Sequence, residues 1–129
     1  MRGGGKIVAV DISVLVVDDD AAFRGLAVRI LTSCGFDIVG QAETVASGMT
    51  RALALRPDAI LVDVRLPDGS GIVLGLELAA LPWAPRVVLT SSDSDAEGEI
   101  PTYDHRAALA FVPKDELPNA PLVRLLAGD

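Results

Sequence analysis

Carboxylate, hydroxyl and ammonium side chains follow closely on short apolar runs at four points of the sequence. They are Asp18 and Asp19, Asp63, Thr90, and Lys114. Clustered carboxylates repel one another unless a cation lies among them, and all-oxygen ligand sets favour Mg²⁺. A carboxylate beside such a metal can act as a nucleophile toward phosphorus and form an acyl phosphate. The metal, the hydroxyl and the ammonium would stabilise the negative charge of the transferred group, so these residues point to phosphoryl transfer.

The apolar runs themselves predict the strands of a parallel sheet. Short continuous runs rich in β-branched residues are typical of strands that helices cover on both faces. Four such runs and one more polar segment are expected to be strands: Ile12 to Val17, Asp37 to Ala42, Ala59 to Val62, Val87 to Leu89, and Leu109 to Val112. Ligands of an open parallel sheet bind at the carboxyl ends of its strands. The candidate side chains are therefore expected to meet at one edge.

The segments between these strands carry apolar residues at helical spacing. The expected stripes are Phe23, Leu26, Ala27, Ile30 and Leu31; Val45, Met49, Ala52 and Leu53; and Ile72, Leu76 and Ala79. Asp20 is placed to cap the first helix and Gly35 to end it. By count a fourth helix belongs at Asp93 to Pro101, where Gly98 and the lack of an apolar stripe predict a short or irregular one. The alternation of strands and helices predicts a doubly wound α/β fold.

Length and composition narrow the class of protein. A chain of 129 residues predicts one domain, with residues 1–11 as a flexible leader and 12–129 as the folded part. The formal net charge of −7 argues against direct binding of nucleic acid by this chain. A lone cysteine, Cys34, excludes an internal disulfide and a cysteine zinc site. No apolar run approaches the roughly 18 residues of a membrane span, so a cytoplasmic location is expected.

Four stretches, in this order and spacing, carry a resemblance to a known family. They are VLVVDDD (Val14 to Asp20), PDAILVDVRLPDGSG (Pro57 to Gly71), VVLTSS (Val87 to Ser92) and AFVPKDELP (Ala110 to Pro118). The chain resembles the receiver domains of two-component response regulators over roughly residues 12 to 127. The resemblance implies a flavodoxin-like fold, a five-stranded parallel sheet with strand order 2-1-3-4-5.

The resemblance also implies a role for each candidate residue. Asp63 matches the phosphoacceptor, and Asp18, Asp19 and the backbone carbonyl of Arg65 match the other protein ligands of Mg²⁺. Three further residues match positions that respond to the phosphoryl group: Thr90 as the switch hydroxyl, Phe111 as the aromatic rotamer switch, and Lys114 as the lysine that pairs with the phosphate. The implied activity is autocatalytic phosphorylation and slow hydrolysis, rather than turnover of a freely diffusing substrate.

The implied partners are a sensor histidine kinase or a phosphotransfer protein, together with an output domain or a downstream protein. The third and fourth stretches look most like the subclass that often precedes a helix-turn-helix domain. The chain ends soon after its last predicted helix, which favours a stand-alone receiver over one cut from a longer regulator. The apolar residues from Leu122 to Leu126 could support a homodimer.

Several departures and alternatives remain open at this point. Asp115 stands where the family usually has a proline after the lysine, and Ser91 is larger than the usual alanine or glycine. These departures favour the alternative of a non-phosphorylated receiver that acts as an interaction module. An aspartyl-phosphate phosphatase would need an acid two residues after Asp63, where Arg65 stands. For Phe111 a place in the core is favoured over the switch role, because the chain has few aromatic side chains and a core needs them.

Overall fold

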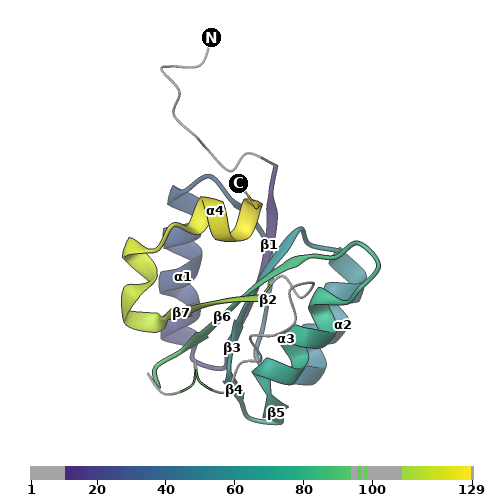
Figure 1. Cartoon of the computed structure of the whole chain (residues 1–129). Helices are drawn as coiled ribbons and strands as arrows, with labels where there is room; N and C mark the ends of the chain where they lie inside the picture. The colour runs from purple at the N-terminus through teal and green to yellow at the C-terminus, as the bar shows by residue number, and fades with distance from the viewer. Residues whose placement is uncertain (1–10, 94–95, 97, 99–108, 129) are drawn as a thin grey trace.

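In the computed structural model, a parallel sheet with strand order β2-β1-β3-β6-β7 forms the centre of the molecule (Figure 1). The structure describes residues 11–93, 96, 98 and 109–128. The strands are β1 (Ser13–Val17), β2 (Asp37–Ala42), β3 (Ala59–Asp63), β6 (Arg86–Ser91) and β7 (Leu109–Pro113). In chain order this is 2-1-3-4-5, so the predicted flavodoxin-like fold is confirmed. Each predicted strand is present, with ends within two residues of those expected.

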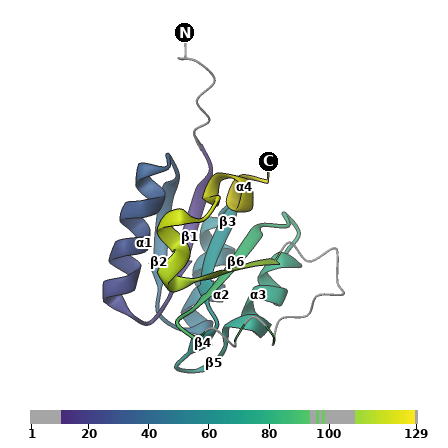
Figure 2. The same ribbon diagram turned by 60° about the vertical axis from the view of Figure 1, so that its left-hand side comes forward.

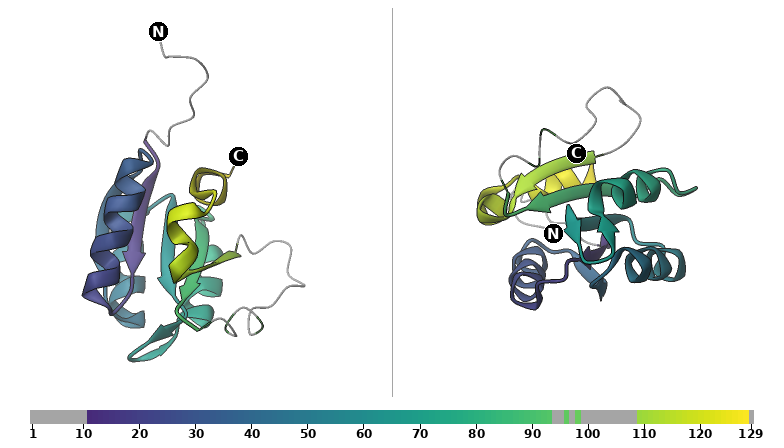
Figure 3. Two further views of the ribbon diagram at one scale, coloured as in Figure 1. Left: turned by 90° about the vertical axis from the view of Figure 1, so that its left-hand side faces the viewer. Right: turned by 90° about the horizontal axis from the view of Figure 1, so that it is seen from below.

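Helices cover both faces of the sheet (Figures 1, 2 and 3). The helices are α1 (Ala21–Ser33), α2 (Val45–Leu55), α3 (Gly71–Ala79) and α4 (Leu122–Ala127), with a 3-10 helix, η2 (Lys114–Asn119), before the last. α1, η2 and α4 lie on one face, and α2 and α3 lie on the other. A two-stranded antiparallel hairpin, β4 (Arg65–Leu66) with β5 (Gly69–Ser70), connects β3 to α3.

Alternate residues of the central strands fill two separate cores. On β1, Val14 and Val16 pack toward α1 and α4, whereas Leu15 and Val17 pack toward α2 and α3. All four side chains are fully buried. This alternation follows from the two-residue period of a strand, and it explains why the apolar run is continuous rather than interrupted by polar residues.

The helix ends follow largely from residues identified in the sequence. The Asp20 carboxylate accepts hydrogen bonds from the backbone N–H groups of Ala22 and Phe23, which confirms it as the cap of α1. Gly35 has a φ of 96°, in the left-handed region that glycine favours, directly after the end of α1. Thr44 caps α2 through a reciprocal capping box with Ser47.

The helices form where the helical spacing predicted them, but some residues of the expected apolar stripes do not lie on the buried face. Leu26 on α1 and Leu53 on α2 are 39% and 54% exposed, because each lies at the margin of its stripe. On α3 the buried face is centred on Leu74 and Leu78 rather than on Leu76 and Ala79. α3 is apolar almost throughout, so periodicity alone could not assign its inner face.

Three predictions concern the ends of the chain and the predicted fourth helix. The expected leader falls almost wholly outside the described residues, and so does most of the segment from Asp93 to Pro101. Within the apolar stretch from Leu122 to Leu126, both end residues lie in the chain's own core at 3% and 1% exposure, and the homodimer stays a prediction. Among the described residues, no helix is both long enough and apolar enough to cross a membrane.

Candidate functional site

The carboxyl ends of β1, β3 and β6 bring the predicted side chains together. Asp18 follows β1 directly, Asp63 is the last residue of β3, and Thr90 lies opposite Asp63 in the register of β3 with β6. Lys114 begins η2 immediately after β7. The backbone N–H of Asp18 bonds to the carbonyl of Ala42 at the end of β2, which continues the sheet by one residue. The parallel topology thus brings together residues that are far apart in the sequence, since Lys114 lies 96 positions after Asp18.

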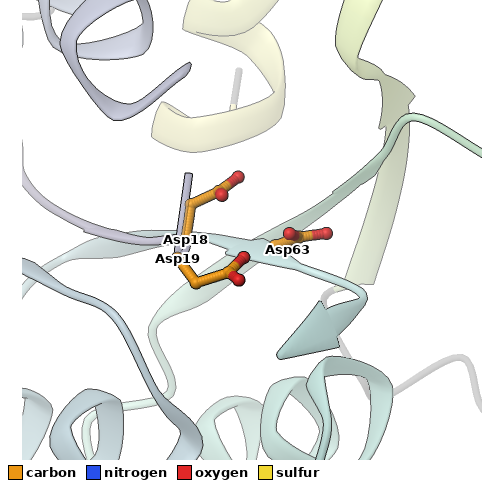
Figure 4. A group of neighbouring side chains, drawn as sticks. All are labelled: Asp18, Asp19 and Asp63. Atoms are coloured by element: carbon orange, nitrogen blue, oxygen red, sulfur yellow. The ribbon is translucent and has the colours of Figure 1, made fainter. Parts of the chain in front are cut away.

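Three carboxylates form the centre of this site (Figure 4). One oxygen from each of Asp18, Asp19 and Asp63 lies within 4.8 Å of the others. Asp18 and Asp63 are 1% and 6% exposed, whereas Asp19 is open to solvent. Figure 4 shows the Asp19 carboxylate directed toward Asp63 from the loop that follows β1. The cluster is therefore buried on one side and accessible on the other.

The Lys114 ammonium bridges two of these carboxylates. Its Nζ lies 2.9 Å from Asp18 Oδ2 and 3.4 Å from Asp63 Oδ2. Burial alone would lower the pKa of Lys114, but the two carboxylates outweigh it and raise the pKa above its ordinary value. The lysine reaches the site although Asp115, and not proline, follows it.

The surroundings of Asp63 disfavour the ionised form of its carboxyl group. Burial raises the pKa of its carboxyl group above the ordinary 3.8, and the negative charge of Asp18 raises it further. The backbone N–H of Arg65, 3.2 Å from Asp63 Oδ1, and the Lys114 ammonium act in the opposite direction without cancelling these effects. The folded environment therefore disfavours the ionised carboxylate relative to a solvated aspartate, and a cation placed beside it would offset that effect.

Thr90 and Phe111, the two predicted switch residues, lie in different environments. Thr90 is fully buried, and within the described residues its Oγ1 has no hydrogen-bond partner. An unpaired buried hydroxyl is costly, so this group is poised to bond to an oxygen introduced beside Asp63. Phe111 is half-buried and packs against the core on the side of α2 and α3. It serves at least as a packing residue, and its role as a switch stays a prediction.

The donor set fits Mg²⁺. Among the residues that the structure describes, three carboxylates meet one ammonium group, which leaves negative charge uncompensated at the site. All the converging donors are oxygens, the ligands that this ion prefers, and the exposure of Asp19 leaves room for the water molecules that Mg²⁺ retains. The raised pKa of Asp63 is a further sign that a cation belongs here.

Sequence reasoning did not predict three side-chain contacts around the site. The Phe23 ring lies 4.6 Å from the Lys114 ammonium, close enough for a cation–π contact. The Arg65 guanidinium forms an ion pair of 2.9 Å with Asp93, which joins the loop after β3 to the loop after β6. Ser91 is buried, and its hydroxyl accepts from the backbone N–H of Asp93 at 2.9 Å. For Phe23, the only signal in the sequence was that an aromatic residue of the first helix follows closely on the acidic run.

The stability of the Asp63→Asn variant tests the electrostatics of the site. Because the folded pKa is raised, ionised Asp63 lowers the stability at neutral pH, and this cost disappears as the pH falls through the folded pKa toward 3.8. Asparagine keeps the shape and removes the charge. In metal-free buffer we expect a Tm higher by a few degrees at pH 7, with the gain shrinking toward pH 4 in thermal unfolding followed by circular dichroism.

Asp58→Asn is the matched control for that measurement. The Asp58 carboxylate is exposed and accepts from the backbone N–H of Ser13 at 2.9 Å and from its hydroxyl at 3.0 Å, at the opposite edge of the sheet. Removing its charge weakens useful hydrogen bonds, so no gain in Tm is expected. A lower Tm of Asp63→Asn at pH 7 would show that the contact with Lys114 outweighs burial.

Known proteins resemble this chain in both sequence and structure. A family model described as the response regulator receiver domain matches residues 14–122. The chain is 42% identical over 86 residues to the DNA-binding transcriptional activator DevR/DosR of Mycobacterium tuberculosis, an alignment that covers 65% of this chain and 40% of that protein. It is 37% identical over 106 residues to protein-glutamate methylesterase/protein-glutamine glutaminase 4 of Hahella chejuensis, covering 80% of this chain and 27% of that protein.

Among solved structures, the CheY-like response regulator receiver domain protein from Methanospirillum hungatei superposes with a TM-score of 0.73 at 23% identity. The superposition covers 88% of this chain and 89% of that one, which shows a shared fold. The chain spans well under half the length of the two curated relatives. Since the family model matches most of the described sheet and helices, the chain belongs to the response regulator receiver domain family.

Proposed function

We propose that this receiver domain accepts a phosphoryl group on Asp63 and thereby changes its interactions with a partner. The observation that carries the proposal is the convergence of Asp63 with two further carboxylates, a buried unpaired hydroxyl and an ammonium at one sheet edge. Asp63 is the member of the cluster that lies opposite Thr90 and within 3.4 Å of Lys114. It is thus the carboxylate best placed for charge developing on phosphorus to be stabilised.

The proposed donor is a phosphohistidine of a sensor kinase or a phosphotransfer protein. A carboxylate oxygen of Asp63 attacks the phosphorus atom, and the bond between phosphorus and the donor imidazole nitrogen breaks. The imidazole keeps the electron pair of that bond and takes up a proton from solvent. Hydrolysis of the resulting acyl phosphate then regenerates the Asp63 carboxylate and releases inorganic phosphate.

The residues of the site have separate parts in this reaction. Asp18, Asp19, Asp63 and the backbone carbonyl of Arg65 would hold Mg²⁺, which supplies positive charge to the phosphoryl oxygens. Lys114 is free to exchange its contact with Asp63 for a phosphoryl oxygen, because Asp18 continues to hold its ammonium at 2.9 Å. The Thr90 hydroxyl would donate to another of these oxygens. That movement at Thr90, with any change at Phe111, would begin the structural response.

The wider role follows from the family and stays within the proposal. The curated relatives are longer than this chain, and the names of two of them denote a transcriptional activator and a methylesterase/glutaminase. We propose a cytoplasmic two-component pathway, with an output domain or a separate downstream protein as the responding partner. A homodimer, if one forms, must use a surface other than the buried side chains of Leu122 and Leu126.

Incubation of the chain with acetyl phosphate and Mg²⁺ tests the proposal directly. Intact-mass spectrometry should show the addition of one phosphoryl group, and chelation of Mg²⁺ with EDTA should prevent it. Beryllium fluoride with Mg²⁺, a mimic of the phosphoryl group, should raise the Tm of the unmodified chain. If neither phosphoryl addition nor beryllium fluoride binding occurs, the alternative of a non-phosphorylated interaction module replaces this proposal.

A further inference from the structure

Asp68 connects the loop that follows the phosphoacceptor to the start of helix α2. Its Oδ1 accepts a hydrogen bond from the backbone N–H of Val45 at 2.7 Å, and its Oδ2 accepts from that of Ala46 at 3.1 Å. Both carboxylate oxygens are thus used across 22 and 23 residues of sequence. Pairing of this kind between a carboxylate and a helix start is charge-assisted and directional. The two bonds lower the pKa of Asp68, which keeps it ionised.

Asp68 lies at the turn of the β4–β5 hairpin, whose base is fixed at Asp63. The backbone N–H of Val64 donates to the Thr90 carbonyl at 2.8 Å, and that of Gly71 donates to the Val64 carbonyl at 2.6 Å. Leu66 is buried among the side chains of the α2 and α3 core. These contacts hold the base and one side of the hairpin, whereas the Asp68 carboxylate holds its tip.

The start of helix α2, to which Asp68 bonds, is held in place by contacts of its own. Thr44 Oγ1 accepts from the N–H of Ser47 at 2.9 Å, so the local cap leaves the N–H groups of Val45 and Ala46 to Asp68. One turn further on, Gly48 packs so closely that a Cβ there would lie 3.2 Å from Leu74 and from Val17. The start of α2 is therefore set against the sheet, and Asp68 transfers that position to the hairpin.

We propose that Asp68 is a positioning residue for the metal-binding half of the site. The hairpin begins at Arg65, whose carbonyl is a proposed Mg²⁺ ligand and whose N–H donates to Asp63 Oδ1. Holding the hairpin tip on α2 fixes the direction of that carbonyl and of the Asp63 carboxylate. This inference rests on the proposed function, since it concerns the affinity of the same site for Mg²⁺ and the rate of phosphoryl uptake.

Asp68→Ala removes both hydrogen bonds, and Asp68→Asn keeps one acceptor while removing the charge. Isothermal titration calorimetry should give a Mg²⁺ dissociation constant that is roughly 10-fold higher for the alanine variant, the lower end of the effect of losing an outer partner of a metal ligand. The asparagine variant should give a smaller increase. The rate of phosphoryl uptake from acetyl phosphate at subsaturating Mg²⁺ should fall in the same order.

Asp58→Ala is the matched control, because Asp58 is also an exposed aspartate that accepts a backbone N–H, that of Ser13 at 2.9 Å. It lies at the amino-terminal edge of the sheet, so its loss should lower the Tm without changing the dissociation constant for Mg²⁺. A merely structural Asp68 would behave in the same way, with a lower Tm and an unchanged dissociation constant. That outcome in either Asp68 variant would overturn the inference.

The wild-type chain separates this inference from the proposed function. If the wild-type chain binds Mg²⁺ and takes up a phosphoryl group while Asp68→Ala matches it in both, only the role of Asp68 is wrong. If the wild-type chain does neither, the proposed function fails and the inference falls with it. Should Asp68→Ala fail to fold by circular dichroism, the milder Asp68→Asn variant decides the question.

Discussion

The Asp63→Asn variant is expected to take up no phosphoryl group from acetyl phosphate at any Mg²⁺ concentration. An amide oxygen carries no full negative charge and cannot form a stable acyl phosphate, so the loss of uptake should be complete rather than partial. Asparagine has the size and shape of aspartate, and it removes a carboxylate whose burial raises its pKa. The variant should therefore stay folded, and intact-mass spectrometry can be compared directly with that of the wild-type chain.

Two measurements exclude other acceptors. Asp58→Asn, the same substitution at the opposite edge of the sheet, should take up one phosphoryl group as the wild-type chain does. Hydroxylamine should release the group from the wild-type chain, since it cleaves acyl phosphates and leaves phosphate esters of hydroxyl groups intact. Uptake by Asp63→Asn, or resistance to hydroxylamine, would place the acceptor at another carboxylate or at a hydroxyl such as that of Thr90 or Ser91.

Much of the site could be predicted from the sequence because its residues end apolar runs. A parallel strand buried on both faces leaves the first polar residue at its carboxyl end, where the sheet topology gathers it with the others. Asp18, Asp63 and Thr90 follow this rule. Lys114 obeys it as well, one residue after β7, and its 2.9 Å contact with Asp18 shows that a proline after it is not required.

The contacts that the sequence did not reveal are made between loops and helix ends. Pro67-Asp68-Gly69 is a sequence typical of a turn, and nothing in it indicates that α2 begins beside Asp68. The ion pair of Arg65 with Asp93 likewise depends on how two loops fold over one edge. Such contacts depend on loop conformation, which periodicity does not determine. The burial of Leu122 and Leu126 could not be predicted for a related reason, since apolar spacing cannot tell a core-facing side chain from an interfacial one.

The electrostatics of the site indicate how fold and function are balanced. The strand topology buries Asp18 and Asp63, and this burial, followed by repulsion from Asp18, raises the pKa of Asp63. Lys114 offsets part of that repulsion. A site with uncompensated carboxylates is therefore less stable than an apolar one would be, and binding of Mg²⁺ should raise the free energy of unfolding.

Gly71→Ala is expected to be the most destabilising single substitution discussed for this chain. A Cβ at position 71 would lie 1.8 Å from the backbone oxygen of Asp63, 2.7 Å from its carbonyl carbon, and 2.9 Å from Val64 Cα. All three atoms belong to the backbone, so no side-chain rotation can relieve the overlap. Either α3 moves away from β3 or the end of β3 shifts. We expect a loss of roughly 3 kcal/mol or more in the free energy of unfolding.

Urea unfolding of Gly71→Ala and of Gly25→Ala separates this overlap from the general effect of adding a methyl group. Gly25 lies within α1, and a Cβ there would meet nothing within 4 Å. Alanine at that position should stabilise the chain by up to about 1 kcal/mol through its helix propensity. The two variants thus shift the urea midpoint in opposite directions.

Equal stability of Gly71→Ala and the wild-type chain would mean that α3 can withdraw from Asp63 at no cost. In that case the close packing of α3 on β3 could not be what fixes the position of Asp63.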